Sequence, residues 1–265
     1  MSRLALTSWS LNRLLTAPAD PLRLVDVPAR MRDAGIGTLE ICHFHFPDTD
    51  ATTLRELRAA LDVAGVELFS ILIDMGDISN ADQRVRQQDV QAISTWIDVA
   101  ATLGAKAVRV VAGEGAPDDE LAIERSIGAL RELSAYGRER NVRVLTENFR
   151  SLAWSARNCL RILDALDGSV GLCADIGNCP AEYRVDEFSA LAARAESVHV
   201  KATYDAAGTP DTDELRQCLD ATSAVAFDGP YTLVYDRPGD PWQGLAMLRA
   251  IVEPYTSHEY SLPVT

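Results

Sequence analysis

The chain of 265 residues carries 39 acidic and 25 basic side chains, which give it a formal net charge of −14 at pH 7. A surface this acidic repels phosphate backbones and anionic lipids, so we expect neither nucleic acid nor a membrane as a partner. Hydrophobic residues make up 47% of the chain, but no apolar run approaches the roughly 18 residues of a membrane span. The amino terminus also lacks a signal-peptide cleavage site. We therefore expect a cytoplasmic protein in which residues 1–265 form a single domain.

Eight short apolar runs rich in β-branched residues recur along the chain, with no linker or low-complexity tract between them. The intervals between them have room for a loop and a helix of about 10 to 15 residues, which is the pattern of repeated βαβ units. The runs predict strands that begin near Leu4, Gly37, Glu67, Ala107, Val142, Val170, Glu196 and Tyr231.

The predicted helices end at residues that favour a left-handed backbone. Gly35, Gly65 and Gly104 each follow an amphipathic stretch and precede a predicted strand, and Asn141 takes the same place after LRELSAYGRERN. Eight strands alternating with helices form either a closed barrel or an open doubly wound sheet. No GxGxxG motif follows the first strand, and the even spacing favours closure. The predicted fold is α/β, a single (β/α)8 barrel.

Charged or polar side chains stand at the carboxyl end of most of the predicted strands. Strands of a parallel barrel are buried on both faces, so a charge there needs a structural reason. Active sites of this fold lie at that end, where the βα loops converge. We therefore expect one polar pocket, built from residues that include Glu40, His43, His45, Asp74, Arg109, Glu147, Asp175, His199, Lys201, Asp236 and Arg237.

Three carboxylates and one imidazole come from four consecutive strands: Glu147, Asp175, His199 and Asp236. This set suits a single octahedral Mn²⁺ or Mg²⁺, or a Zn²⁺ with an open position. With only four histidines in the chain, a cluster of several zinc ions is not expected. The alternative is that these groups form ion pairs that close the barrel mouth without a metal, with Arg109, Arg150, Lys201 and Arg237 as their partners.

The five cysteines are odd in number, scattered, and form no CxxC pair. We expect them to be reduced and mostly buried thiols. Cys173 and Cys179 flank the end of the sixth predicted strand, which leaves a metal-ligand role as an alternative for these two.

Several side chains are candidates for contacting a substrate. Trp9, Phe46 and Trp242 could form an apolar wall for a sugar ring, although aromatic residues at loop starts also cap barrel cores. His43 and His45 are candidates for contacting hydroxyl or phosphate groups, with half-buried loop histidines as the alternative. Arg109 and Arg150 are candidate anchors for a phosphate or carboxylate. In the tail, His258 is expected to be exposed, and the tail itself to pack on the barrel or on a second subunit of a homo-oligomer.

Four motifs in the second half of the chain carry a family resemblance: TENF, CADIGN, VHVKA and GPYTLVYD. They resemble the sugar phosphate isomerase/epimerase family, whose fold is a xylose isomerase-like TIM barrel. The resemblance implies that Glu147, Asp175 and His199 bind one divalent metal and that Lys201 belongs to an HxK pattern. The last metal-binding Glu of the family falls on Val234 here, with Asp236 two residues further as a substitute. The family often has a His at the position of Asn178, which we assign to substrate binding.

The function implied by the resemblance is isomerisation or epimerisation of a ketose or related polyol in carbohydrate metabolism, by proton transfer next to a carbonyl. Glu147 or Asp236 would act as the base, and Lys201 would stabilise negative charge on oxygen. The same groups would serve a lyase or dehydratase acting on a keto sugar, or an aldol cleavage. A further alternative, motivated by Val234, is a metal-free barrel that acts as a binding protein. Phosphodiester hydrolysis conflicts with the net charge and the few histidines.

Overall fold

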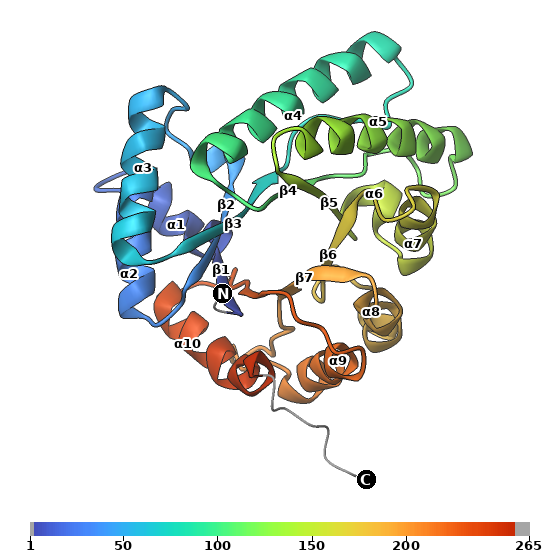
Figure 1. The fold of residues 1–265 in the computed structure, drawn as a ribbon. Helices are drawn as coiled ribbons and strands as arrows, with labels where there is room; N and C mark the ends of the chain where they lie inside the picture. Colours follow the sequence, from blue (N-terminus) through green and yellow to red (C-terminus); the bar gives the residue numbers. More distant parts are fainter. Residues whose placement is uncertain (1–2, 258–265) are drawn as a thin grey trace.

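The computed structural model describes residues 3–257, which form a closed barrel of eight parallel strands in the order β1 to β8 (Figure 1). The observed strands begin at, or one residue from, the predicted positions, and the predicted (β/α)8 barrel is confirmed. The strands are β1 (Leu4–Thr7), β2 (Thr38–Cys42), β3 (Glu67–Ile73), β4 (Ala107–Val110), β5 (Arg143–Glu147), β6 (Gly171–Asp175), β7 (Ala195–Val200) and β8 (Tyr231–Leu233).

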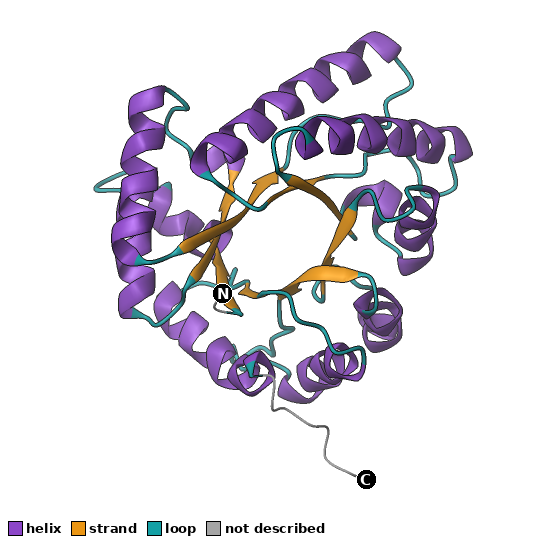
Figure 2. Ribbon diagram, in the orientation of Figure 1, coloured by secondary structure: helices purple, strands orange, loops and turns teal. Residues whose placement is uncertain are grey.

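Helices surround the ring of strands on the outside (Figure 2). None of the helices within residues 3–257 is both long and apolar enough to cross a bilayer. They are α1 (Asn12–Leu15), α2 (Val27–Asp33), α3 (Ala51–Ala64), α4 (Gln83–Leu103), α5 (Glu120–Arg138), α6 (Arg150–Ala153), α7 (Ala156–Ala165), α8 (Arg184–Ala192), α9 (Thr212–Ala224) and α10 (Pro241–Val252).

The predicted helix ends have the expected backbone. Gly65 and Gly104 close α3 and α4 with φ angles of 66° and 70°. Gly35 and Asn141 also lie in the left-handed region, at 69° and 57°. Each of these residues reverses the chain toward the next strand, so the prediction from glycine spacing is confirmed at all four positions.

The barrel has two apolar regions of very different size. Outward-facing strand residues and the inner faces of the helices form the large core. A second cluster consists of Phe69, Ala107 and Leu145. Successive strand residues point to opposite faces, so Ala107 and Leu145 face the same way as Arg109 and Glu147 two residues further on. This small cluster therefore forms the apolar floor beneath the charged end of the barrel.

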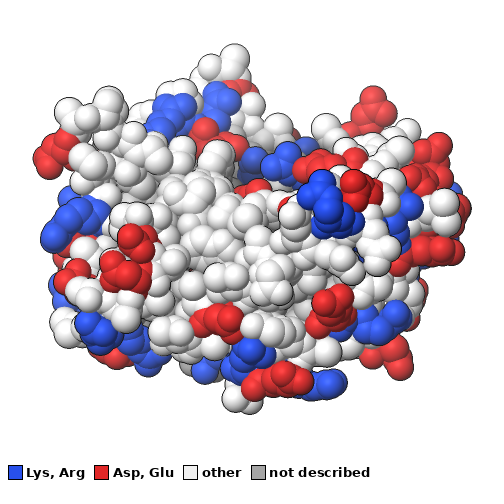
Figure 3. Space-filling view, turned by 90° about the horizontal axis from the view of Figure 1, so that it is seen from above, with Lys and Arg blue, Asp and Glu red and all other residues white. Residues whose placement is uncertain are grey.

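The remaining barrel interior is unusually polar. Ser70, Ser197 and Thr232 are fully buried, and their hydroxyl oxygens have no hydrogen-bond partner within the protein. Buried polar groups of this kind are normally satisfied by ordered water. The charged outer surface differs from this interior, because acidic and basic side chains are interspersed there around a broad uncharged area (Figure 3).

Candidate functional site

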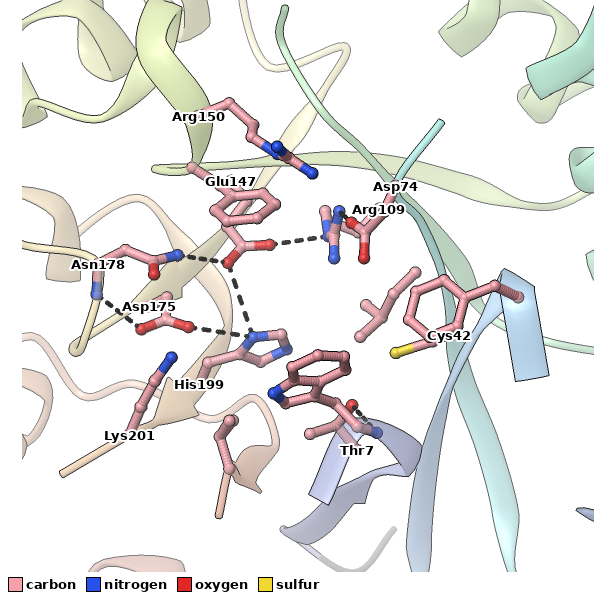
Figure 4. A pocket seen from close by; sticks show the side chains of 15 residues that line it. Thr7, Cys42, Asp74, Arg109, Glu147, Arg150, Asp175, Asn178, His199 and Lys201 are labelled. Atoms are coloured by element: carbon pink, nitrogen blue, oxygen red, sulfur yellow. Dashed lines mark hydrogen bonds and ion pairs between the residues drawn. The ribbon is translucent and has the colours of Figure 1, made fainter. Parts of the chain in front are cut away.

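A pocket of about 370 Å³ opens at the carboxyl ends of the strands (Figure 4). Nine of the predicted residues line it: Trp9, Asp74, Arg109, Glu147, Arg150, Asp175, Asn178, His199 and Lys201. The lining is completed by Thr7, Cys42, Phe44, Leu72, Phe149 and Val234. The pocket therefore lies where active sites of this fold are found.

Glu147, Asp175 and His199 end three neighbouring strands, and their side chains converge on one side of the pocket (Figure 4). The Nδ1 atom of His199 lies 3.8 Å from Glu147 Oε1 and 3.6 Å from Asp175 Oδ2. These separations are too long for hydrogen bonds. Two ligands that each lie about 2.1 Å from one cation are separated by up to about 4.2 Å. The separations of Glu147 and Asp175 from His199 therefore each fit two ligands of one divalent ion.

Cys173 is the other candidate ligand at this place. Among the described residues, Glu147, Cys173 and His199 offer ligand atoms that all lie within 4.8 Å of one another. Burial raises the pKa of the Cys173 thiol to about 11. Carboxylates suit Mn²⁺ and Mg²⁺ and thiolates suit Zn²⁺, so Asp175 is the candidate third ligand for Mn²⁺ or Mg²⁺ and Cys173 the candidate for Zn²⁺. All five cysteines are buried and free, as expected.

Asn178 holds two of the converging carboxylates in place. Its side-chain amide donates to Glu147 Oε1 at 2.9 Å, and its backbone N–H donates to Asp175 Oδ1 at 3.0 Å. Below it, Asn148 pairs with the backbone of Asp175 in both directions. The loop after β6 thus orients the carboxylates, and Asn178 also lines the pocket.

A buried cation faces these carboxylates from β4. Arg109 Nε lies 2.8 Å from Glu147 Oε2, and another guanidinium nitrogen contacts Asp74. The Glu147 oxygen has no hydrogen-bond partner in the protein, so its contact with Arg109 is ionic only. Burial would raise the pKa of Asp74, but Arg109 holds it below its usual value. The sequence left open that ion pairs with Arg109 neutralise the carboxylates without a metal. Such ion pairs are present, and they include the candidate metal ligand Glu147.

The pKa values of Glu147 and His199 are both raised, for different reasons. Burial raises the pKa of Glu147 to about 7, against the opposing effects of Arg109 and His199. Burial alone would lower the pKa of His199, but Cys173, Glu40 and Asp175 raise it well above its usual value. A carboxylate with a pKa near neutrality is suited to accept and return a proton.

Lys201 and Asp236 form an ion pair, with Nζ 2.9 Å from Oδ2. Burial would lower the pKa of Lys201, but Asp236 raises it. Asp236 was expected to be a metal ligand, but it does not lie with Glu147 and His199. Its carboxylate pairs with Lys201, and its side chain borders a neighbouring cavity. Val234 lines the pocket at the family's last ligand position. A Cβ on Gly177 would lie only 2.6–2.8 Å from the Lys201 side chain, so Gly177 lets the lysine pass close to the loop.

The other predicted substrate residues lie around the pocket rather than in its lining. His45 is buried between Ser8 and Asn12, at 2.7 and 2.9 Å. His43 accepts a hydrogen bond from the backbone N–H of Asp74. The aromatic residues Phe46 and Trp242 pack against the large core, and Arg237 lies over the ring of Tyr204. His258 is outside the described residues.

Glu40 was expected to help build the polar pocket, but its contact with His199 was not predicted from the sequence. Glu40 of β2 is fully buried, and its Oε2 lies 2.7 Å from His199 Nε2. The sequence feature that could have pointed to this role is a carboxylate between Leu39 and Ile41, in a strand that is otherwise mostly apolar. Such a burial is costly without a partner, but the sequence does not show which side chain that partner is.

The protein is thus an α/β barrel with carboxylates, an imidazole and cationic side chains in one pocket at the carboxyl ends of its strands. This is the arrangement of an enzyme active site in this fold. A family model described as xylose isomerase-like TIM barrel matches residues 28–250. The chain therefore belongs to the xylose isomerase-like TIM barrel family. Comparison with curated proteins by sequence finds no match.

Solved structures share the whole fold at low sequence identity. An L-ribulose 3-epimerase superposes with a TM-score of 0.78 at 19% identity, covering 97% of this chain and 95% of that one. A Mycobacterium smegmatis protein in complex with magnesium gives 0.70 at 17%, covering 97% and 98%. A probable 3-DHS dehydratase, AsbF, from Bacillus anthracis gives 0.71 at 18%, covering 96% and 99%. At this level of identity the similarity shows the fold alone.

Proposed function

We propose that the protein is a divalent-metal-dependent isomerase or epimerase that transfers a proton next to the carbonyl of a ketose or related polyol. The observation that carries this proposal is the convergence of Glu147 and Asp175 on Nδ1 of His199 at the floor of the pocket, at 3.8 and 3.6 Å. The fold relatives support it, because an L-ribulose 3-epimerase has the same barrel along nearly its whole length.

Glu147, Asp175 and His199 would hold the metal, which we expect to be Mn²⁺, Mg²⁺ or Zn²⁺. When bound, a divalent ion polarises a carbonyl and orients the substrate. The structural relative in complex with magnesium supports a divalent ion. Val234 offers no ligand atom, so the proposed set has three protein ligands and leaves room for substrate.

In the proposed mechanism Glu147 removes the proton at the carbon beside the carbonyl and returns it. Asn178 holds one Glu147 oxygen at 2.9 Å and so fixes the direction of the other. Lys201, whose ammonium group is kept in the pocket by Asp236, stabilises the negative charge that develops on the substrate oxygen. Arg150 at the rim is available to bind an anionic group of the substrate.

A lyase or dehydratase acting on a keto sugar is the second candidate. Epimerisation inverts a carbon, so it is served by proton donors on both faces of the substrate, and Val234 removes the carboxylate that the family supplies from β8. Elimination of water needs only one base and an acid for the leaving group. The whole-chain fold similarity to AsbF, a probable dehydratase, supports this candidate.

Metal analysis tests the proposal. Protein purified without chelator should contain one divalent ion per chain, and Glu147→Gln and His199→Ala should lose it. Glu114→Gln is the matched control, because Glu114 is a half-exposed carboxylate that does not line the pocket. Wild-type protein that remains metal-free and ignores added Mn²⁺ in thermal unfolding would favour the binding-protein alternative.

Deuterium exchange separates the two enzymatic candidates. The holoenzyme is incubated with candidate ketoses in deuterated water. Deuterium at a carbon next to the carbonyl, with no loss of water, supports isomerisation or epimerisation. A new unsaturated product without an isomer supports the dehydratase.

A further inference from the structure

Glu40 and His199 come from strands that are not neighbours, yet their side chains meet inside the barrel. Glu40 lies on β2 and His199 on β7, with β1 and β8 between them in the ring. Glu40 Oε2 lies 2.7 Å from His199 Nε2. The side chains are 1% and 5% exposed, so water does not compete for this contact.

Glu40 does not line the pocket, whereas His199 does. The other carboxylate oxygen of Glu40 is buried and has no hydrogen-bond partner in the protein. The contact with His199 is therefore the main polar interaction through which this buried carboxylate can act on the site.

The contact with Glu40 fixes which ring nitrogen faces the site. With Nε2 donating to Glu40, Nδ1 is the atom that faces Glu147 and Asp175, at 3.8 and 3.6 Å (Figure 4). A ring flipped about its Cβ–Cγ bond would lose the bond to Glu40. Carboxylates that accept from the second nitrogen of a ligating histidine commonly set both its orientation and its basicity.

We propose that Glu40 is a positioning residue that holds the imidazole of His199 with Nδ1 toward the divalent-metal site. The proposal rests on the metal-dependent function above, but part of its test does not require metal. Glu40 contacts Nε2, on the side of the imidazole ring away from the proposed metal. It is therefore not itself a metal ligand.

The first measurement is made on metal-free protein. A strong, buried N–H bond from His199 Nε2 should give a slowly exchanging imidazole proton resonance at low field, beyond the backbone amide region. Its loss in His199→Gln assigns it. The resonance should disappear in Glu40→Ala and persist, shifted, in Glu40→Gln, because the amide oxygen of Gln still accepts the bond.

The second measurement is the affinity for Mn²⁺ by titration calorimetry. Glu40→Ala should weaken binding by roughly 10- to 100-fold, and Glu40→Gln should recover most of it. Ser70→Ala is the matched control, since Ser70 is the β3 partner of Glu40 in the sheet register and its buried hydroxyl has no hydrogen-bond partner. It should change neither the resonance nor the affinity.

The outcomes separate this inference from the proposed function. An unchanged resonance and unchanged Mn²⁺ affinity in Glu40→Ala would overturn the positioning role, as would an equal loss in Ser70→Ala. Circular dichroism checks folding, and Glu40→Gln keeps the test usable if the alanine variant does not fold. If the wild type binds no Mn²⁺, the metal-dependent function fails, and the resonance alone decides whether Glu40 holds the ring.

Discussion

Strands β5 to β7 and strands β2 to β4 face the same pocket but contribute in different ways. The first group supplies the candidate metal ligands that line the pocket: Glu147, Asp175 and His199. The second group supplies buried partners of these side chains: Glu40 on His199, and Arg109 on Glu147. Strands β5 to β7 thus carry the candidate ligands, and β2 to β4 help to orient and neutralise them, together with Asn178 after β6.

The largest effect is expected at Glu147. Replacing it with Gln keeps the shape and removes the base, so turnover should fall roughly a hundred- to ten-thousand-fold. The measurement is deuterium exchange into the substrate that the wild type accepts. Glu114→Gln should retain near wild-type exchange. Comparable activity of Glu147→Gln and the wild type would mean that another residue is the base.

Arg109 should matter more for stability than for binding. Arg109→Met leaves Asp74 and Glu147 buried without their cation, which should cost about 3 to 5 kcal/mol of unfolding free energy. Urea denaturation measures it. Arg150→Met, at a residue whose side chain is 42% exposed, should change stability by less than about 0.5 kcal/mol. Similar losses in both variants would contradict the assignment of Arg109 as the buried counter-charge.

Arg150 should determine affinity for an anionic group. Its backbone lies in the left-handed region with φ of 62°, unusual for a side chain of this size. Its guanidinium lines the pocket, 3.5 Å from Glu114 and 4.9 Å from the centre of the Phe149 ring. Arg150→Gln should weaken binding of inorganic phosphate about tenfold, which corresponds to about 1.4 kcal/mol. Calorimetry measures this, with Arg157→Gln on the outer face of α7 as control. Equal binding by both variants and the wild type would indicate an uncharged substrate.

The smallest effect concerns His45, which follows β2. The side-chain oxygen of Asn12 accepts from Nε2 of His45, so in the neutral ring Nδ1 is free to accept from the Ser8 hydroxyl, whose oxygen accepts from the backbone N–H of Cys42. Burial lowers the pKa of His45 to about 4. The unfolded chain therefore binds more protons between about pH 6.5 and 4, and stability is lost as the pH falls through that range.

The expected loss from His45 is about 1 kcal/mol between about pH 7 and pH 5, after allowance for solvent screening. Chemical denaturation at both pH values measures it in the wild type and in His45→Asn, whose pH dependence should be flatter. Parallel pH profiles for the two proteins would show that His45 does not titrate on unfolding.

The fold could be predicted because strand spacing and helix ends are local properties. Gly65, Gly104 and Asn141 end or follow helices for reasons contained in their own backbones. The ligand candidates could also be predicted, because a charge at the end of a buried parallel strand is costly unless it lies in a shared polar site. Glu147 and Asp175 meet both conditions.

The pairings could not be predicted, because they depend on side-chain direction across the barrel. Asp236 was expected to join the ligands, but it lies beyond the end of β8, where it binds Lys201. Trp242 packs on the core because it lies in the first turn of α10. The contact of Glu40 with His199 joins residues 159 positions apart, and no local pattern encodes that distance.

The close approach of Gly177 to Lys201 has a consequence for redesign. Because the stem of Lys201 lies against a residue without a side chain, any side chain at position 177 would push the stem aside and strain the ion pair of its ammonium group with Asp236. Substituting a larger residue at position 177 would tilt the amine while leaving the lysine itself unchanged. Substitution at position 177 is therefore a way to change which substrate oxygen the Lys201 ammonium group contacts.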